Sequence, residues 1–95
     1  MKVRNMYSTR GNKVPNQFII EGDNKVIFQS YASTIATIDY DTKTVTLGED
    51  WDYSTTTGKY RNLFFEEYFP ALSDKYGLIK AIKAGEYRGW AIIAE

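Results

Sequence analysis

WDYSTTTGKYRNLFFEEY, residues 51–68, is the stretch at which the chain passes from strand-like to helical patterning. Hydroxyl side chains at positions 54–57 offer several possible N-caps for a helix. Pro70 ends the pattern, because proline disfavours helical backbone in the residue before it. We therefore predict a helix near residues 57–68. Its apolar side chains recur at helical spacing and form one stripe for packing: Tyr60, Leu63, Phe64 and Tyr68.

The part of the chain before Gly48 alternates apolar and polar residues with period two, which is typical of half-buried strands. Turn sequences such as Gly22-Asp23-Asn24 separate these segments, as expected for a meander of antiparallel hairpins. The alternating threonines predict that one face of the sheet lies in water. Pro15 excludes a regular central strand around it, because proline lacks the N–H that strand pairing needs. The predicted strands are Lys2–Thr9, Gln17–Glu21, Lys25–Ser30, Thr34–Tyr40 and Thr44–Leu47.

The part of the chain after residue 68 predicts a second helix and a last strand. Ser73 is the expected cap of a helix over residues 74–84, and Gly85 suits the position after its last turn. Residues 86–94 alternate again and predict a strand. The fold class is therefore α+β, with an antiparallel β-sheet of five or six strands and two α-helices on one face. A chain of this length makes a single domain, residues 1–95.

The composition excludes several kinds of chemistry. The chain has no histidine and no cysteine, which removes Cys/His zinc sites, thiol chemistry and histidine general bases. We expect no metal and no cofactor. The carboxylate pairs fall at turns or point apart on a helix, so we also expect no enzymatic activity. These pairs are Asp39 with Asp41, Asp50 with Asp52, and Glu66 with Glu67.

The charge of the chain sums to zero but is unevenly distributed. Residues 21–52 carry seven acids against two lysines, whereas the first thirteen residues carry four cations and no acid: Lys2, Arg4, Arg10 and Lys13. Proteins that bind nucleic acid tightly usually have a basic excess, so we expect at most weak binding of this kind. No apolar run approaches the ~20 residues that span a bilayer, and no apolar signal region follows the early basic residues. We therefore expect a cytoplasmic protein without a membrane partner.

The first turn of the predicted helix is a candidate anion site, because free backbone N–H groups and the helix dipole attract negative charge there. A phosphate or a nucleotide is the ligand that this chemistry favours. Tyr53 and Tyr60 stand where the phosphate loop GxxxxGK[ST] needs glycine and a hydroxyl, so the segment is not a phosphate loop. The alternative is plain N-capping, with Arg61 paired to a nearby carboxylate. The candidate ligand residues are Thr55, Thr56, Thr57, Gly58, Lys59 and Arg61.

The same segment is a candidate contact surface for a protein partner, because aromatic and arginine side chains dominate protein interfaces. We expect Trp51 to be at least partly buried in the core, and Lys59 and Arg61 to be exposed. An Arg61 buried in an intramolecular ion pair would not belong to a binding site. The candidate contact residues are Trp51, Asp52, Tyr53, Lys59 and Arg61.

Three segments carry a family resemblance: PNQFII at 15–20, FQSYASTIATID at 28–39 and WDYSTTTGKYRN at 51–62. They resemble a small uncharacterised family of bacteriophages and bacterial mobile elements. Residues beyond Pro70 resemble it less closely. The resemblance implies an accessory protein of phage type, and such proteins often act by blocking a component of host defence.

Three functions follow from these observations. The first is a non-enzymatic protein that binds and inhibits a host macromolecule, such as an antiviral defence nuclease or its nucleic-acid complex, in the manner of an anti-CRISPR protein. The second is a binding module that captures a nucleotide-like anion at the helix start. The third is weak nucleic-acid binding through the basic N-terminal strand. The sequence leaves the oligomeric state open.

Overall fold

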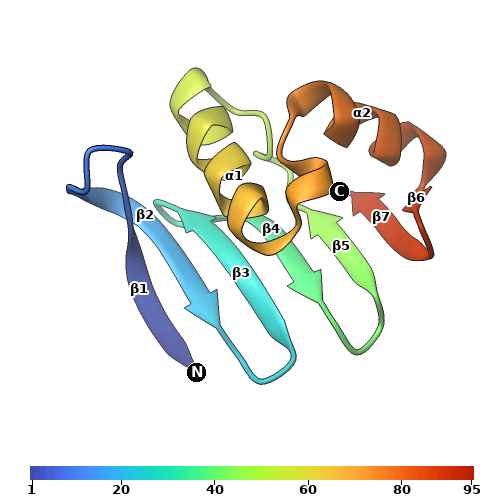
Figure 1. Cartoon of the computed structure of the whole chain (residues 1–95), viewed down its shortest axis with the longest axis horizontal. Helices are drawn as coiled ribbons and strands as arrows, with labels where there is room; N and C mark the ends of the chain where they lie inside the picture. Colours follow the sequence, from blue (N-terminus) through green and yellow to red (C-terminus); the bar gives the residue numbers. More distant parts are fainter.

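The computed structural model describes residues 1–95, which form a seven-stranded sheet and two α-helices (Figure 1). The strands lie side by side in the order β1-β2-β3-β4-β5-β7-β6. The helices are α1 (Thr55–Tyr68) and α2 (Lys75–Ala84), joined through the short 3-10 helix η1 (Pro70–Leu72). The α+β class is confirmed. The strands are β1 Lys2–Tyr7, β2 Lys13–Glu21, β3 Lys25–Ser30, β4 Ser33–Asp39, β5 Thr44–Leu47, β6 Glu86–Tyr87 and β7 Trp90–Ala94.

The sheet is mixed and has seven strands, which corrects the expectation of five or six antiparallel strands. Strands β1 to β5 form the predicted antiparallel meander, but β7 pairs with β5 in parallel. The chain leaves β5, passes through both helices and returns along the same edge, and a connection of this length permits parallel pairing. The predicted last strand is divided into β6 and β7. Arg88 and Gly89, with φ of 47° and 89°, turn the chain between them.

Strand β2 begins earlier than predicted and includes Pro15. The pairing of β1 with β2 is regular up to Asn5, which lies opposite Phe18, and its register then shifts. Asn16 in the shifted part has φ of 65°, a left-handed conformation that asparagine tolerates better than most residues. Pro15 therefore lies in an irregular part of the ladder, where its missing N–H does not break a regular pair.

Both helices cover one face of the sheet and close a single core with it (Figure 1). Phe28 of β3 stacks on Phe64 of α1, with ring centroids 5.8 Å apart. The predicted placement of the two helices is therefore confirmed. Neither helix has the length and apolar character needed to cross a bilayer. The core draws on six strands and both helices, and includes Met6, Ile19, Val26, Phe28, Ile38, Val45, Leu47, Ile92, Phe64, Phe65, Leu78 and Ala81.

Side-chain caps fix where the helices begin. Ser54 caps α1 by accepting a hydrogen bond from the Thr57 N–H at 3.1 Å, so the helix starts slightly before the predicted residue 57. Asp74 caps α2 in place of the expected Ser73, whose hydroxyl donates to a carbonyl of η1 instead. Gly85, with φ of 73°, ends α2 as predicted, because glycine adopts this left-handed conformation without steric cost.

The opposite face of the sheet is uncovered. Val3 and Ile93, at the two ends of one row, are 64% and 49% exposed, while the residues between them are partly shielded by their neighbours. The predicted solvent-facing side of the sheet is confirmed. The row consists of directly paired residues and crosses six strands: Val3, Ile20, Ile27, Thr37, Thr46 and Ile93.

Gly48 lies where the chain leaves the sheet for α1, and a side chain does not fit there. Its N–H donates to the Ile35 carbonyl at 2.9 Å, which holds its backbone against β4. A Cβ atom at this position would lie 2.1 Å from the carbonyl oxygen of Thr34. This close approach sets the start of the loop that carries Trp51 and Asp52.

We predict that Gly48→Ala destabilises the fold by about 1–3 kcal/mol, the usual cost of forcing extra volume into a packed site. The matched control is Gly58→Ala in α1, where an added Cβ would meet its nearest neighbour, the Arg61 guanidinium, at 3.5 Å. Alanine favours a helix over glycine, so the control should stabilise by about 0.5–1 kcal/mol. Urea unfolding followed by circular dichroism measures both changes. A Gly48→Ala variant as stable as the wild type would contradict the close approach.

Candidate functional site

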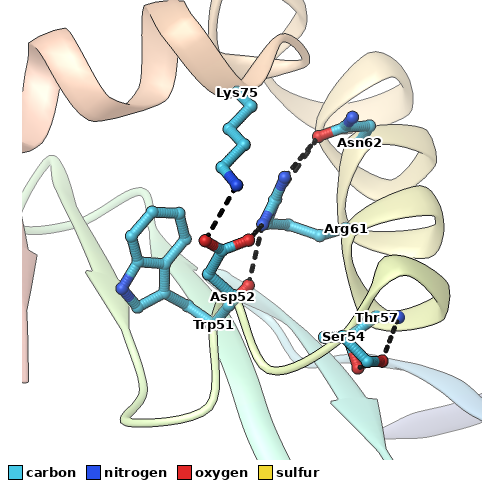
Figure 2. A network of polar contacts seen from close by, with 7 residues as sticks. All are labelled: Trp51, Asp52, Ser54, Thr57, Arg61, Asn62 and Lys75. Carbon is cyan, nitrogen blue, oxygen red and sulfur yellow. Dashed lines mark hydrogen bonds and ion pairs between the residues drawn. The ribbon is translucent and has the colours of Figure 1, made fainter.

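Arg61, in the middle of α1, is the centre of a polar network (Figure 2). Its Nη1 donates to the Trp51 carbonyl at 2.9 Å and to Oδ1 of Asp52 at 3.2 Å. Its Nε and Nη2 donate to Oδ1 of Asn62 at 3.3 and 3.1 Å. The Arg61 residue is 1% exposed, so a buried charge is met here by one counter-ion and by neutral acceptors.

The Arg61 network joins three parts of the chain: the loop after β5, α1 and the start of α2 (Figure 2). Lys75 at the start of α2 places its Nζ 3.0 Å from Oδ2 of Asp52. The guanidinium carbon of Arg61 lies 5.3 Å from the centre of a Trp51 ring, a distance that suits a cation–π interaction. Hydrogen bonds from Lys75, and then from Arg61, lower the pKa of Asp52. Asp52 is therefore ionised at neutral pH and uses both oxygens inside the protein.

The burial of Arg61 shows that its predicted exposure was wrong. The residue lies beside the apolar stripe of α1, and the loop before the helix supplies acceptors that compensate for its loss of water. Arg61 therefore stabilises the fold, and we remove it from both the candidate anion site and the candidate contact surface. Trp51 is partly buried, as expected, and Asp52 is held in the network. Tyr53 and Lys59 are exposed.

The candidate anion residues do not form one site. Thr56 and Thr57 line a pocket on one side of the helix start. A separate polar hollow of about 540 Å³ lies on the other side, where Asp52 pairs with Arg61 and Lys75, two of the three cations that line it. The remaining candidates line this hollow together with three other residues of the network: Thr55, Gly58, Lys59, Arg61, Asp52, Asn62 and Lys75.

The pocket lined by Thr56 and Thr57 has a volume of about 560 Å³ and lies between the sheet and the first turn of α1. We call it the tyrosine pocket, because Tyr31 and Tyr53 line it and are 65% and 77% exposed. Gln17 is 2% exposed, and its Oε1 is the one buried side-chain polar atom without a hydrogen-bond partner. The other polar side chains that matter below are Ser30, Ser33 and Asp50.

Sequence reasoning missed the tyrosine pocket because its residues come from separate segments. Ser30 and Ser33 flank a tight corner and look like turn residues, while Gln17 opens an apolar strand. One signal was available in the alternation of β2. Gln17 has the same parity as Ile19, so a strand that buries Ile19 also points the Gln17 amide toward the core side.

Residues 1–77 match the profile of a protein family of unknown function. The chain belongs to this family, DUF8033. The matched range of the DUF8033 chain contains the Arg61 network and the tyrosine pocket, whereas β6 and β7 lie outside it. No curated protein and no solved structure matches the chain. Membership of a small uncharacterised family, expected from the sequence, is therefore confirmed.

Arg4, one of the four N-terminal cations of this DUF8033 protein, forms ion pairs and a hydrogen bond within the fold. Arg4 lies 3.1 Å from Glu21 and 2.6 Å from Glu67, and it donates to the Tyr68 hydroxyl at 3.0 Å. Burial acts to lower the pKa of Arg4, but hydrogen bonds to these partners outweigh it and raise the pKa above its usual range. Burial also raises the pKa of Tyr68 to about 12. Arg4 thus ties the first two strands to α1, which weakens the basic strand as a nucleic-acid contact.

We predict that Asp52→Asn destabilises the protein by about 1–3 kcal/mol at neutral pH, because the buried Arg61 loses its charged acceptor. Because the Asp52 side chain is 38% exposed, water screens its charge, and we expect a loss of stability toward the lower end of this range. A lowered pKa means that Asp52 stabilises the fold fully above its unfolded pKa, near 3.8, and less as pH falls through its folded pKa. The variant should lack this acid-dependent loss, which thermal unfolding from neutral to acidic pH measures.

Lys75→Met is the matched control, since it removes the other partner of the same carboxylate. Lys75 is 49% exposed in its side chain, so this ion pair should contribute less than about 0.5 kcal/mol. Equal losses of stability in Asp52→Asn and Lys75→Met would contradict the central role of the buried Arg61.

Proposed function

We propose that this DUF8033 protein is a non-enzymatic accessory protein of phage type that binds and inhibits a host macromolecule in the bacterial cytoplasm. The proposed target class is an antiviral defence nuclease or its nucleic-acid complex. The observation that carries the proposal is the pair of exposed rings, Tyr31 and Tyr53, on one pocket. Exposed aromatic side chains beside a pocket are favourable anchors for a protein partner.

The proposed contact surface differs from the one expected from the sequence. Tyr53 and Lys59 remain in it, because both side chains are exposed. Tyr31 joins them from the corner between β3 and β4. Trp51 and Arg61 are no longer part of the proposed surface. Their contact with each other holds the loop that carries Tyr53. The surface thus combines Tyr53, on the loop that the buried network holds in place, with Tyr31 on the corner between β3 and β4 and with Lys59 on α1, on the other side of the helix start. The support of the Tyr53 loop favours binding with little loss of conformational entropy.

The placement of the carboxylates supports binding rather than catalysis. Asp39 accepts hydrogen bonds from two backbone N–H groups of the turn after β4. Asp50 accepts a hydrogen bond from the Ser33 hydroxyl at 3.0 Å, and Asp52 pairs with Arg61 and Lys75. A general acid or base needs a carboxylate that is free to approach a substrate. These side chains already have structural partners, so we assign them no catalytic role.

The proposed function is tested by phage plating on bacteria that carry an active defence nuclease, with and without expression of this protein. We expect expression to restore plating and the purified protein to bind the nuclease or its complex directly. Tyr53→Ala should weaken that binding by at least about tenfold, or ~1.4 kcal/mol, and should reduce the rescue.

Tyr76→Ala is the matched control for this experiment. Tyr76 lies on α2, is 83% exposed and does not line the tyrosine pocket. The control should retain both binding and rescue, and melting curves should show that both variants are folded. Equal behaviour of Tyr53→Ala and Tyr76→Ala would contradict the proposed surface. Failure of the wild type to rescue plating against a panel of defence nucleases would contradict the proposed function.

A further inference from the structure

We propose that the tyrosine pocket binds a small uncharged planar ring with both hydrogen-bond donors and acceptors, the chemistry of a nucleobase or nucleoside. This inference does not depend on the proposed inhibitory function. It also differs from the anion site expected at the helix start, because the pocket contains only Thr56 and Thr57 of the six candidate anion residues and the proposed ligand has no phosphate.

The unpaired amide of Gln17 is the first reason to assign a ligand to this pocket. A buried polar atom without a partner costs free energy, and such atoms are rare in folded proteins. Gln17 is 2% exposed, lines the pocket and leaves its Oε1 unpaired. A carboxamide presents a donor and an acceptor side by side, which matches the paired donor and acceptor on the edge of a base. A base in the pocket would supply the partner that the protein lacks once the Gln17 amide turns toward it, because the Oε1 atom itself is fully buried.

Charge in the pocket disfavours an anionic ligand. No cationic side chain lines it, and the Asp50 carboxylate does. Lys59, Arg61 and Lys75 line the separate hollow on the other side of the helix start. A phosphate in the tyrosine pocket would meet Asp50 without a compensating side-chain charge, whereas the N–H group of a base would find an acceptor there. The pocket thus favours a nucleoside over a nucleotide.

Shape and aromatic lining agree with a ring ligand. The volume of about 560 Å³ lies within the roughly 300–1,000 Å³ of small-molecule sites. Tyr31 and Tyr53 are both largely exposed without a ligand, and either ring offers a surface on which a base can stack. Tyr31 has φ of 55°, an uncommon conformation for a bulky residue, so the backbone holds this ring at the pocket against a steric cost. Ser30 and Ser33 add hydroxyls that both donate and accept.

The test is calorimetric titration of the purified chain with each of the common nucleosides, their monophosphates and short single-stranded oligonucleotides. We expect at least one nucleoside to bind with Kd below about 1 mM, and its monophosphate to bind more weakly. Gln17→Met keeps the shape but removes the amide, so it should weaken binding at least about tenfold. The same variant should melt at an equal or higher temperature, because a buried unpaired amide is removed. This opposite effect on binding and stability would not result from loss of structure.

Tyr53→Leu provides a second variant should Gln17→Met fail to fold, and Tyr76→Leu, far from the pocket lining, is its control. Tyr53→Leu should weaken nucleoside binding, and Tyr76→Leu should leave it unchanged. Absence of nucleoside binding, equal binding by all variants, or tighter binding of monophosphates than of nucleosides would each overturn the inference. Binding of oligonucleotides without binding of free nucleosides would also overturn it, since the recognised group would then be the nucleic-acid backbone.

Discussion

A guanidinium group in a protein interior needs acceptors and a counter-ion, and this requirement fixes how α1 joins the rest of the fold. The loop before the helix must present the Trp51 carbonyl and the Asp52 carboxylate to Arg61. With the helix start held in this way, the next turn places Phe64 on Phe28 of the sheet. The position of α1 therefore determines both the polar network around Arg61 and the apolar contact of Phe64 with Phe28. A substitution that disturbs one of them also disturbs the other.

Two polar groups of residues that are adjacent in the sequence lie on opposite sides of the start of α1. On one side, Asp52 and Arg61 neutralise each other, and the polar hollow there has a carboxylate in its lining. On the other side, Thr56 and Thr57 line the tyrosine pocket, where the buried Gln17 amide lacks a partner. The Arg61 network, in which the charged groups are paired, stabilises the fold. The tyrosine pocket, in which the Gln17 Oε1 is unpaired, is the proposed ligand site.

Local patterns predicted most of the fold but little of the candidate site. Period-two alternation and turn residues gave the meander from β1 to β5, and helical spacing gave α1 and α2. The parallel pairing of β7 with β5 was not predictable in this way, because it depends on where a long connection returns. The burial of Arg61 was not predicted, because arginine is usually exposed. Here three nearby acceptors form hydrogen bonds with its guanidinium and compensate for its loss of water. The role proposed for Gln17 depends on the lack of a partner for its buried Oε1, which no local sequence pattern encodes.

The parallel strand β7 divides the sheet into parts that differ in how they can form and open. Neighbouring strands of the meander are close in the chain, whereas Val45 and Ile92 pair across 47 positions. Closing so long a loop costs more conformational entropy than closing a hairpin, so the contact between β5 and β7 forms after the meander. The two-residue strand β6 lies outside this contact at the edge of the sheet, so we expect this edge to open before the centre of the meander when the native state fluctuates. We therefore expect amide hydrogens along the shared edge of β5 and β7 to exchange with solvent sooner than those between β3 and β4.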